Sequence, residues 1–84
     1  MEYLYTARFL RSLKKHEETV QDDVVAAVCL FEKGKSDKIL KLHKLHGKFE
    51  GYYAFSVNFI YRIIIKKEKN VIYYIDVGSH DVYK

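Results

Sequence analysis

The chain has 84 residues, of which 49% are hydrophobic and 31% are charged. This length supports one small hydrophobic core and the composition excludes a disordered chain, so we expect a single domain over residues 1–84. The formal net charge of +4 favours polyanionic partners, nucleic acid above all. A solvated lysine-rich surface explains the same charge equally well.

The N-terminal half predicts one strand and two helices. Residues 2–6 alternate and carry two tyrosines, which is typical of a short strand, and Thr6 can cap a helix that begins at Ala7. A second helix is predicted over residues 17–33. Apolar residues recur there at spacings of three and four, namely Val20, Val24, Ala27, Val28 and Phe31.

Cys29 is the only cysteine of the chain. Together with Val25 it broadens the apolar stripe of the second helix, so we interpret it as a buried, inert thiol. A chain without a possible internal disulfide fits a reducing compartment. No run of residues is long enough to span a bilayer and the N-terminus lacks a signal-peptide pattern, so we expect a cytoplasmic protein.

The C-terminal half predicts an antiparallel sheet. Residues 39–47 mix apolar and basic positions, which indicates an extended connector or irregular strand. Residues 52–57, 61–66 and 71–77 alternate, and Asn58 and residues 68–70 form the turns between them. Connections this short join antiparallel strands. The predicted fold class is α+β: an N-terminal strand and two helices packed on one face of a small antiparallel β-meander.

Metal and nucleotide sites have no support in the sequence. The four histidines and one cysteine lack zinc-type spacing, since His43 and His46 alone are insufficient. Gly47 and Gly51 are isolated, so a phosphate-binding glycine loop is missing. We therefore predict neither a metal nor a cofactor.

Three polar residues near the last strands are candidates for chemistry. Arg62 has apolar neighbours, so it should project from the face of a middle strand that lies opposite the core, where its planar guanidinium can bind phosphate or pair with a carboxylate. His80 comes after a strand end and is linked to it by Gly78 and Ser79. It is interpreted either as a proton carrier or as a surface residue without a chemical role. Tyr83 can stack on a base or pack the C-terminus onto the sheet.

Three segments in register resemble the RelE/ParE toxin superfamily, in particular its RelE, YafQ and YoeB branches. They are HKLHGKFEGYYAF at 43–55, YRIII at 61–65 and VGSHDVY at 77–83. The resemblance covers nearly the whole chain. It implies a RelE-like fold and a toxin of a type II toxin–antitoxin system that cleaves messenger RNA on the ribosome. The implied partners are a cognate antitoxin, mRNA and the ribosome.

The resemblance also implies roles for individual residues. His43 falls at the position of a general base, Arg62 at that of the arginine that stabilises the scissile phosphate, and His80 at that of a general acid. The reverse assignment, with His80 as the base and His43 as the acid, stays open. So does the alternative that His43 only belongs to the connector and has no catalytic role. Tyr83 matches the terminal aromatic residue. Residues implied to hold the RNA or ribosome are Lys38, Lys41, Lys44, Lys48 and Ser56.

This chain departs from the pattern of YafQ-like members at several positions. Where this chain has Ser56, those members often carry a second histidine, and near the position of Ile60 they carry an acidic residue. Where this chain has Asp76, they carry an arginine. Two alternatives therefore stay open: a ParE-like toxin that poisons DNA gyrase, and a catalytically inactive member that acts by binding its antitoxin. Arg62 together with two histidines favours the nuclease.

Overall fold

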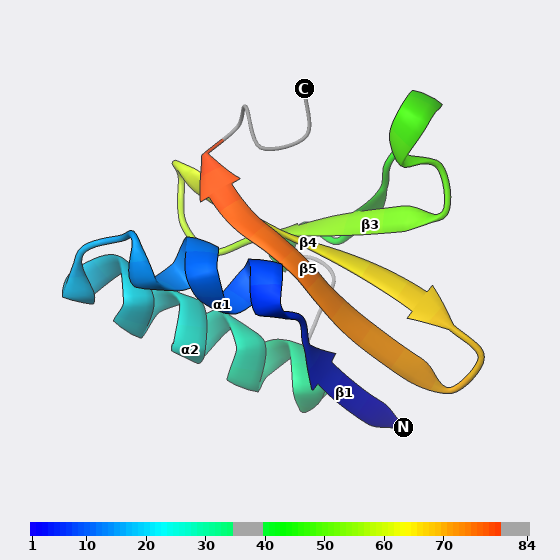
Figure 1. The fold of residues 1–84 in the computed structure, drawn as a ribbon, viewed down its shortest axis with the longest axis horizontal. Coiled ribbons are helices and arrows are strands. Elements are labelled where there is room, and N and C mark those ends of the chain that lie inside the picture. Colours follow the sequence, from blue (N-terminus) through cyan, green and yellow to red (C-terminus); the bar gives the residue numbers. More distant parts are fainter. Residues whose placement is uncertain (35–39, 80–84) are drawn as a thin grey trace.

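A mixed sheet of five strands, in the order β1-β5-β4-β3-β2, forms the centre of the computed structural model, which describes residues 1–34 and 40–79. Two helices cover one face of this sheet (Figure 1). The strands are β1 Glu2–Tyr5, β2 His43–Lys44, β3 Tyr52–Ser56, β4 Tyr61–Glu68 and β5 Val71–Ser79. The helices are α1 Ala7–Lys14, α2 Glu18–Glu32 and the 3-10 turn η1 Gly47–Phe49.

The predicted fold class is confirmed, with one addition to the strand pairing. Strands β2 to β5 form the expected antiparallel meander, but β1 pairs parallel with β5, Glu2 lying opposite Val71. Alternation of apolar residues gives the face of a strand and not its direction, so the sequence did not predict this pairing. The connector expected at 39–47 contributes the two-residue strand β2, whose His43 lies opposite Ala54.

Thr6 joins the first strand, the first helix and the last strand. Its hydroxyl oxygen accepts a hydrogen bond from the Phe9 backbone nitrogen at 3.2 Å, which confirms the predicted N-cap. The same hydroxyl donates to the Tyr74 carbonyl oxygen at 2.7 Å. The beginning of α1 is thereby fixed to β5.

None of the helices in the described residues is long and apolar enough to cross a membrane.

The main core lies between the helices and the sheet, and a smaller cluster lies on the opposite face. Both helices contribute to the main core, α1 through Phe9 and α2 through Val24 and Ala27. The buried members contributed by the sheet are Phe55, Ile63, Ile65, Ile72, Tyr74 and Val77. The smaller cluster consists of Leu45 from the segment after β2, Ala54 from β3 and Ile64 from β4.

The predicted burial of Cys29 is wrong. Cys29 is exposed, and Val25 is 58% exposed. The stripe of α2 that faces the sheet passes through Val24 and Ala27, and Val25 and Cys29 lie to one side of it on the helix surface. They line a groove between α1 and α2 instead. The sequence pattern overestimated the width of the buried stripe because α2 packs on the sheet along only one side.

A bulge in β5 turns Asp76 toward α1. Tyr74 pairs with Ile65 and Asp76 pairs with Ile64, so Ile75 is an extra residue on β5. Ile75 packs on the small cluster. The Asp76 carboxylate, in a residue only 7% exposed, accepts hydrogen bonds from Arg8 Nε, Ser12 Oγ and the Val77 backbone nitrogen. A buried carboxylate needs such donors, and these fix α1 on the sheet.

Tyr74 should make the stability of the protein fall at alkaline pH. Its side chain is fully buried and its hydroxyl donates to Glu32 Oε2 at 2.6 Å. Burial, followed by the Glu32 hydrogen bond and charge, raises the pKa of Tyr74 well above 10. The unfolded chain loses this proton near pH 10 and the folded chain keeps it, so the stabilisation is complete below pH 10 and decreases above it.

We expect the unfolding free energy to fall by up to about 1.4 kcal/mol per pH unit above pH 10 on this account. Urea unfolding followed by circular dichroism between pH 8 and 11 measures the slope. Tyr74→Phe should remove most of it. Tyr5→Phe should remove less, because Tyr5 also donates to Glu32 but is 47% exposed. An equal slope in wild type and Tyr74→Phe would contradict this assignment.

Candidate functional site

The face of the sheet opposite the helices carries three of the polar residues that the sequence singled out, namely Arg62, His43 and Ser56. Residues paired directly across neighbouring strands lie on the same face of a sheet. Arg62 pairs with Ser56 on β3 and with Gly78 on β5. His43 pairs with Ala54, which belongs to the small cluster on this face. By register, Arg62 therefore lies on the face opposite the main core, as predicted, together with His43 and Ser56. At the edge of the sheet its side chain also reaches a cavity that α2 lines.

Backbone oxygens hold the half-buried Arg62 side chain in place. Its Nη1 donates to the carbonyl oxygen of Asn58 at 3.0 Å and to that of Tyr61 at 3.1 Å. A guanidinium carries five N–H donors in a planar fork, so these two bonds orient the group. Gly78, on the neighbouring strand, adds no side chain beside it. The result is an oriented cation at the edge of the sheet face.

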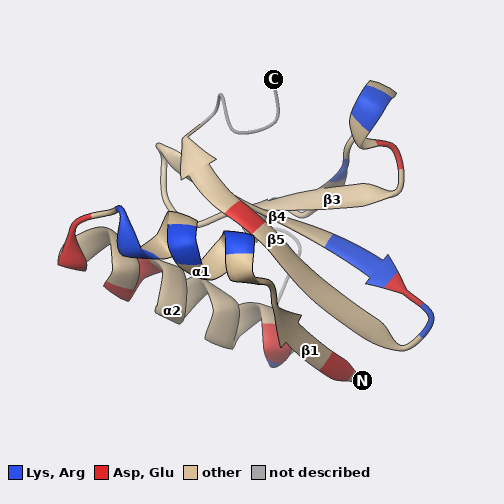
Figure 2. Cartoon of the chain, in the orientation of Figure 1, with Lys and Arg blue, Asp and Glu red and all other residues tan. Residues whose placement is uncertain are grey.

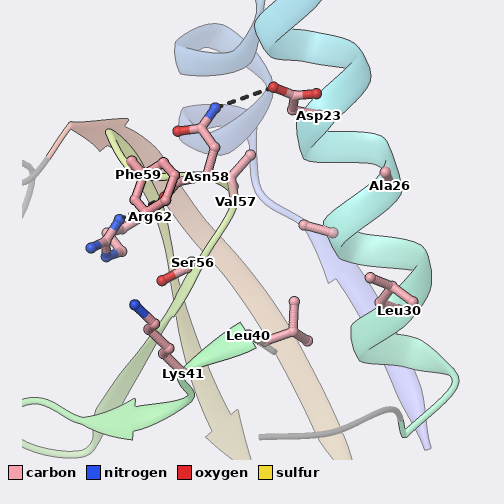
Figure 3. A pocket seen from close by; sticks show the side chains of 11 residues that line it. Asp23, Ala26, Leu30, Leu40, Lys41, Ser56, Val57, Asn58, Phe59 and Arg62 are labelled. Carbon is pink, nitrogen blue, oxygen red and sulfur yellow. Dashed lines mark hydrogen bonds between the residues drawn. The ribbon is translucent and has the colours of Figure 1, made fainter. Parts of the chain in front are cut away.

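Asn58 organises the turn between β3 and β4. Its Oδ1 accepts hydrogen bonds from the backbone nitrogens of Ile60 at 2.8 Å and Tyr61 at 2.9 Å, which confirms the predicted turn. Its Nδ2 donates to Asp23 Oδ2 on α2 at 3.2 Å, the contact drawn in Figure 3. The turn is thus tied both to itself and to α2, and it presents Phe59 to solvent with 92% of the residue exposed.

A cavity of about 470 Å³ separates α2 from the end of β3 (Figure 3). Its α2 wall is mostly apolar, with Ala26, Ala27 and Leu30. Its opposite wall carries the polar groups Ser56, Arg62 and Lys41. The remaining lining residues are Asp23, Leu40, Val57, Asn58 and Phe59. The arrangement combines two cationic side chains with an apolar wall, a pairing suited to a ligand that is anionic at one end and apolar at the other.

His43 has a defined tautomer. The ring is exposed, and Nδ1 lies 2.8 Å from the carbonyl oxygen of Lys41. A carbonyl oxygen only accepts, so Nδ1 carries the proton, and in the neutral ring Nε2 keeps its lone pair. His43 lies opposite Ala54 on β3, and Arg62 lies opposite Ser56 two residues further along β3. Their Cα atoms are therefore separated by two inter-strand spacings across the sheet and two residues along it, or about 12 Å.

The structure brings together some of the sequence-predicted residues and not others. Arg62, Ser56 and Lys41 line one cavity, and His43 is bonded to the Lys41 backbone. Lys44 pairs with Tyr53 and so lies on the helix side of the edge strand. The Lys48 ammonium lies 5.5 Å from the Phe49 ring centroid, in η1 rather than at the cavity. Lys38, His80 and Tyr83 lie outside the described residues.

Asp23, Asn58 and Phe59 line the cavity although the sequence reasoning gave them no role at a site. Asp23 is one of the acidic residues near the start of α2, with Glu18 and Asp22, and Figure 2 shows acidic segments at that end of the helix. A pair of apolar residues directly after a turn asparagine is the available signal for the exposed Phe59. For Asp23 the sequence holds no signal, because its contact with Asn58 spans 35 positions.

Comparison with known proteins finds a likeness of structure and none of sequence. No protein-family model matches the chain, and no curated protein matches it. YafQ from Escherichia coli BL21(DE3) matches with a TM-score of 0.77 and 16% identity over 94% of this chain and 92% of that one.

Two further structures support the same fold. A chain of the E. coli DinJ–YafQ toxin complex matches with a TM-score of 0.77 and 17% identity, over 99% of this chain and 98% of that one. The YoeB dimer from Staphylococcus aureus matches with a TM-score of 0.73 and 15% identity, over 95% and 97% of the two chains. The predicted RelE-like fold is confirmed by these likenesses.

Proposed function

We propose that this chain, which has the fold of YafQ and YoeB, is the toxin of a type II toxin–antitoxin system and cleaves messenger RNA on the ribosome. The observation that carries the proposal is the placement of Arg62 and His43 on one face of the sheet, with the His43 tautomer set by the Lys41 carbonyl. An oriented guanidinium and a neutral imidazole with a free Nε2 lone pair are the groups that phosphodiester cleavage in RNA needs.

The reaction can be written with protein side chains and the RNA alone. His43 Nε2 accepts the proton of a ribose 2′-OH, and the 2′-oxygen attacks the adjacent phosphorus. The bond from phosphorus to the 5′-oxygen breaks, and an acid, assigned to His80 from the sequence, protonates that oxygen. The products are a 2′,3′-cyclic phosphate and a 5′-hydroxyl. Arg62 stabilises the charge that grows on the non-bridging oxygens.

Neighbouring groups support binding of the strand. The Lys41 side chain lines the same cavity as Arg62, and the Ser56 hydroxyl can donate to a phosphate oxygen there. The net charge of +4 adds a long-range attraction for RNA. In this proposal Lys44 and Lys48 contact ribosomal or message backbone outside the cavity, which is the role that the family resemblance implies for them.

A cognate antitoxin is the second proposed partner. YafQ, whose fold this chain shares, has been crystallised in complex with DinJ. A basic protein of this kind fits an acidic partner, because complementary charge speeds association and selects the partner. We propose that such an antitoxin covers the face that carries Arg62 and so keeps the bound toxin inactive in the cytoplasm.

Induced expression in a bacterial host tests the proposal. We expect growth arrest and, by primer extension on several messages, new 5′ ends in translated regions. These ends should disappear when a mutated start codon blocks translation of the message. Growth arrest accompanied by DNA damage and without such ends would contradict the nuclease and favour gyrase poisoning. Normal growth would contradict both toxins and favour a protein that acts by binding its antitoxin.

A further inference from the structure

The proposed cleavage reaction leaves one part of the cavity without a role. The reaction uses Arg62 and His43, which act on a phosphate and a ribose. The cavity extends from Arg62 to α2, where Ala26, Ala27 and Leu30 form an apolar wall. Phosphate and ribose are polar and gain nothing from such a wall. The cavity therefore fits a larger group than the phosphodiester itself.

We infer that this cavity binds one nucleobase of the RNA strand whose phosphate Arg62 holds, and so gives the nuclease a base preference. The inference rests on the proposed function. Its volume of about 470 Å³ lies within the range of about 300–1,000 Å³ of small-ligand pockets. Its composition, apolar with few placed polar groups, is also that of a ligand pocket. A base in the cavity keeps its phosphate beside Arg62 and Lys41, where the polar wall lies.

Phe59 provides a stacking surface at the edge of the cavity. It lines the cavity and is 92% exposed, and the next residue, Ile60, is 57% exposed, so the turn offers apolar surface to a ligand. Three hydrogen bonds made by the Asn58 side chain hold its turn in place, so the ring is presented on a fixed backbone. Proteins that bind single-stranded RNA use exposed aromatic rings beside cationic groups in this way.

Asp23 favours some nucleobases over others in the cavity. Its carboxylate lies on the α2 side and already accepts one hydrogen bond, from Asn58 Nδ2. A carboxylate has further acceptor sites and no donor. It can therefore accept a hydrogen bond from the exocyclic amino group of adenine, cytosine or guanine, whereas uracil has no amino group and offers only its ring N3–H. We expect binding to favour amino-bearing bases over uracil.

A paired substitution on α2 tests the cavity without touching Arg62 or His43. Ala26→Phe fills the cavity, and Val25→Phe adds the same ring to the groove on the other side of the helix. The probes are 2′-O-methyl trinucleotides of adenine and of uracil, which cannot be cleaved because they lack a 2′-OH. Titration into the ¹⁵N-labelled protein, followed by NMR, gives affinity and the residues contacted.

For the adenine probe we expect shifts at the amides of Leu30, Val57 and Phe59 as well as at Arg62. Ala26→Phe and Phe59→Ala should each weaken its binding about tenfold, the loss that removal of one base contact produces. Val25→Phe should bind as the wild type does. Uracil should bind more weakly than adenine, and Asp23→Asn should reduce the difference.

Several outcomes would overturn the inference and leave the nuclease proposal intact. Shifts confined to Arg62 and Lys41, with Ala26→Phe binding normally, would show phosphate binding without a base pocket. Normal RNA binding in Ala26→Phe and Phe59→Ala, combined with loss of the antitoxin in pull-down of the co-expressed pair, would assign the cavity to the protein partner. The nuclease proposal itself is decided by translation-dependent cleavage, which this binding measurement does not use.

Discussion

Replacing Arg62 by alanine should lower the rate of messenger RNA cleavage about 10²–10³-fold and restore growth of the expressing host, because one oriented charge donor to a developing oxyanion contributes that much. Arg62 is bonded to the Asn58 and Tyr61 carbonyl oxygens, and its wall of the cavity also carries Lys41 and Ser56. Cleavage is measured by primer extension and growth by colony counts after induction. Arg62→Lys should recover only part of the activity, since lysine keeps the charge and loses the planar fork.

The matched control is Arg11→Ala, which removes an equal charge from the last turn of α1. It should stay fully toxic, whereas His80→Ala should lose toxicity as Arg62→Ala does if His80 is the acid. Circular dichroism and retained antitoxin binding show whether each variant is folded. A folded Arg62→Ala protein with undiminished toxicity would show that the nuclease site is wrongly assigned.

Replacing Asp76 by alanine should destabilise the fold by about 2–3 kcal/mol, a large share of the total of about 5–15 kcal/mol for a domain. The loss leaves Ser12 and the buried Val77 N–H without their acceptor. The Arg8 side chain is 65% exposed, so its ion pair with Asp76 adds little to this figure. Urea unfolding at pH 7 measures the change.

Two further variants separate the buried acceptor from surface charge. Asp76→Asn keeps one acceptor oxygen, so its loss should be smaller than that of Asp76→Ala. Glu68→Ala removes the partner of Lys66 in an exposed ion pair and should leave the urea midpoint unchanged. Equal midpoints for Asp76→Ala and wild type would show that α1 is held on the sheet by its apolar contacts alone.

Features that depend on neighbours in sequence were predictable. The Thr6 cap and the Asn58 turn each follow from a side chain bonding to a backbone group within three residues. The position of Arg62 on its face follows from strand alternation alone. Each of these is local chemistry and needs no knowledge of how distant elements pack.

Features that depend on distant contacts were not predictable. The exposure of Cys29 depends on where α1 lies beside α2, which the helical pattern does not contain. In the sequence, Asp76 is noticed only as a departure from the pattern of YafQ-like toxins. Its structural role depends on a bulge and on Ser12, 64 positions away. The cavity at Arg62 likewise requires α2 and the β3–β4 turn to meet through Asp23 and Asn58.

The parallel pairing of β1 with β5 has a consequence for synthesis of the protein. Glu2 lies opposite Val71 and Tyr5 opposite Tyr74, so the first strand to leave the ribosome pairs with the last. The nascent chain therefore cannot close its sheet, bury Tyr74 or bond Asp76 to α1 until β5 has emerged. Contacts this distant in sequence also form slowly once the chain is free. The cell thus has an interval after translation in which the chain exists but its five-stranded sheet is still incomplete.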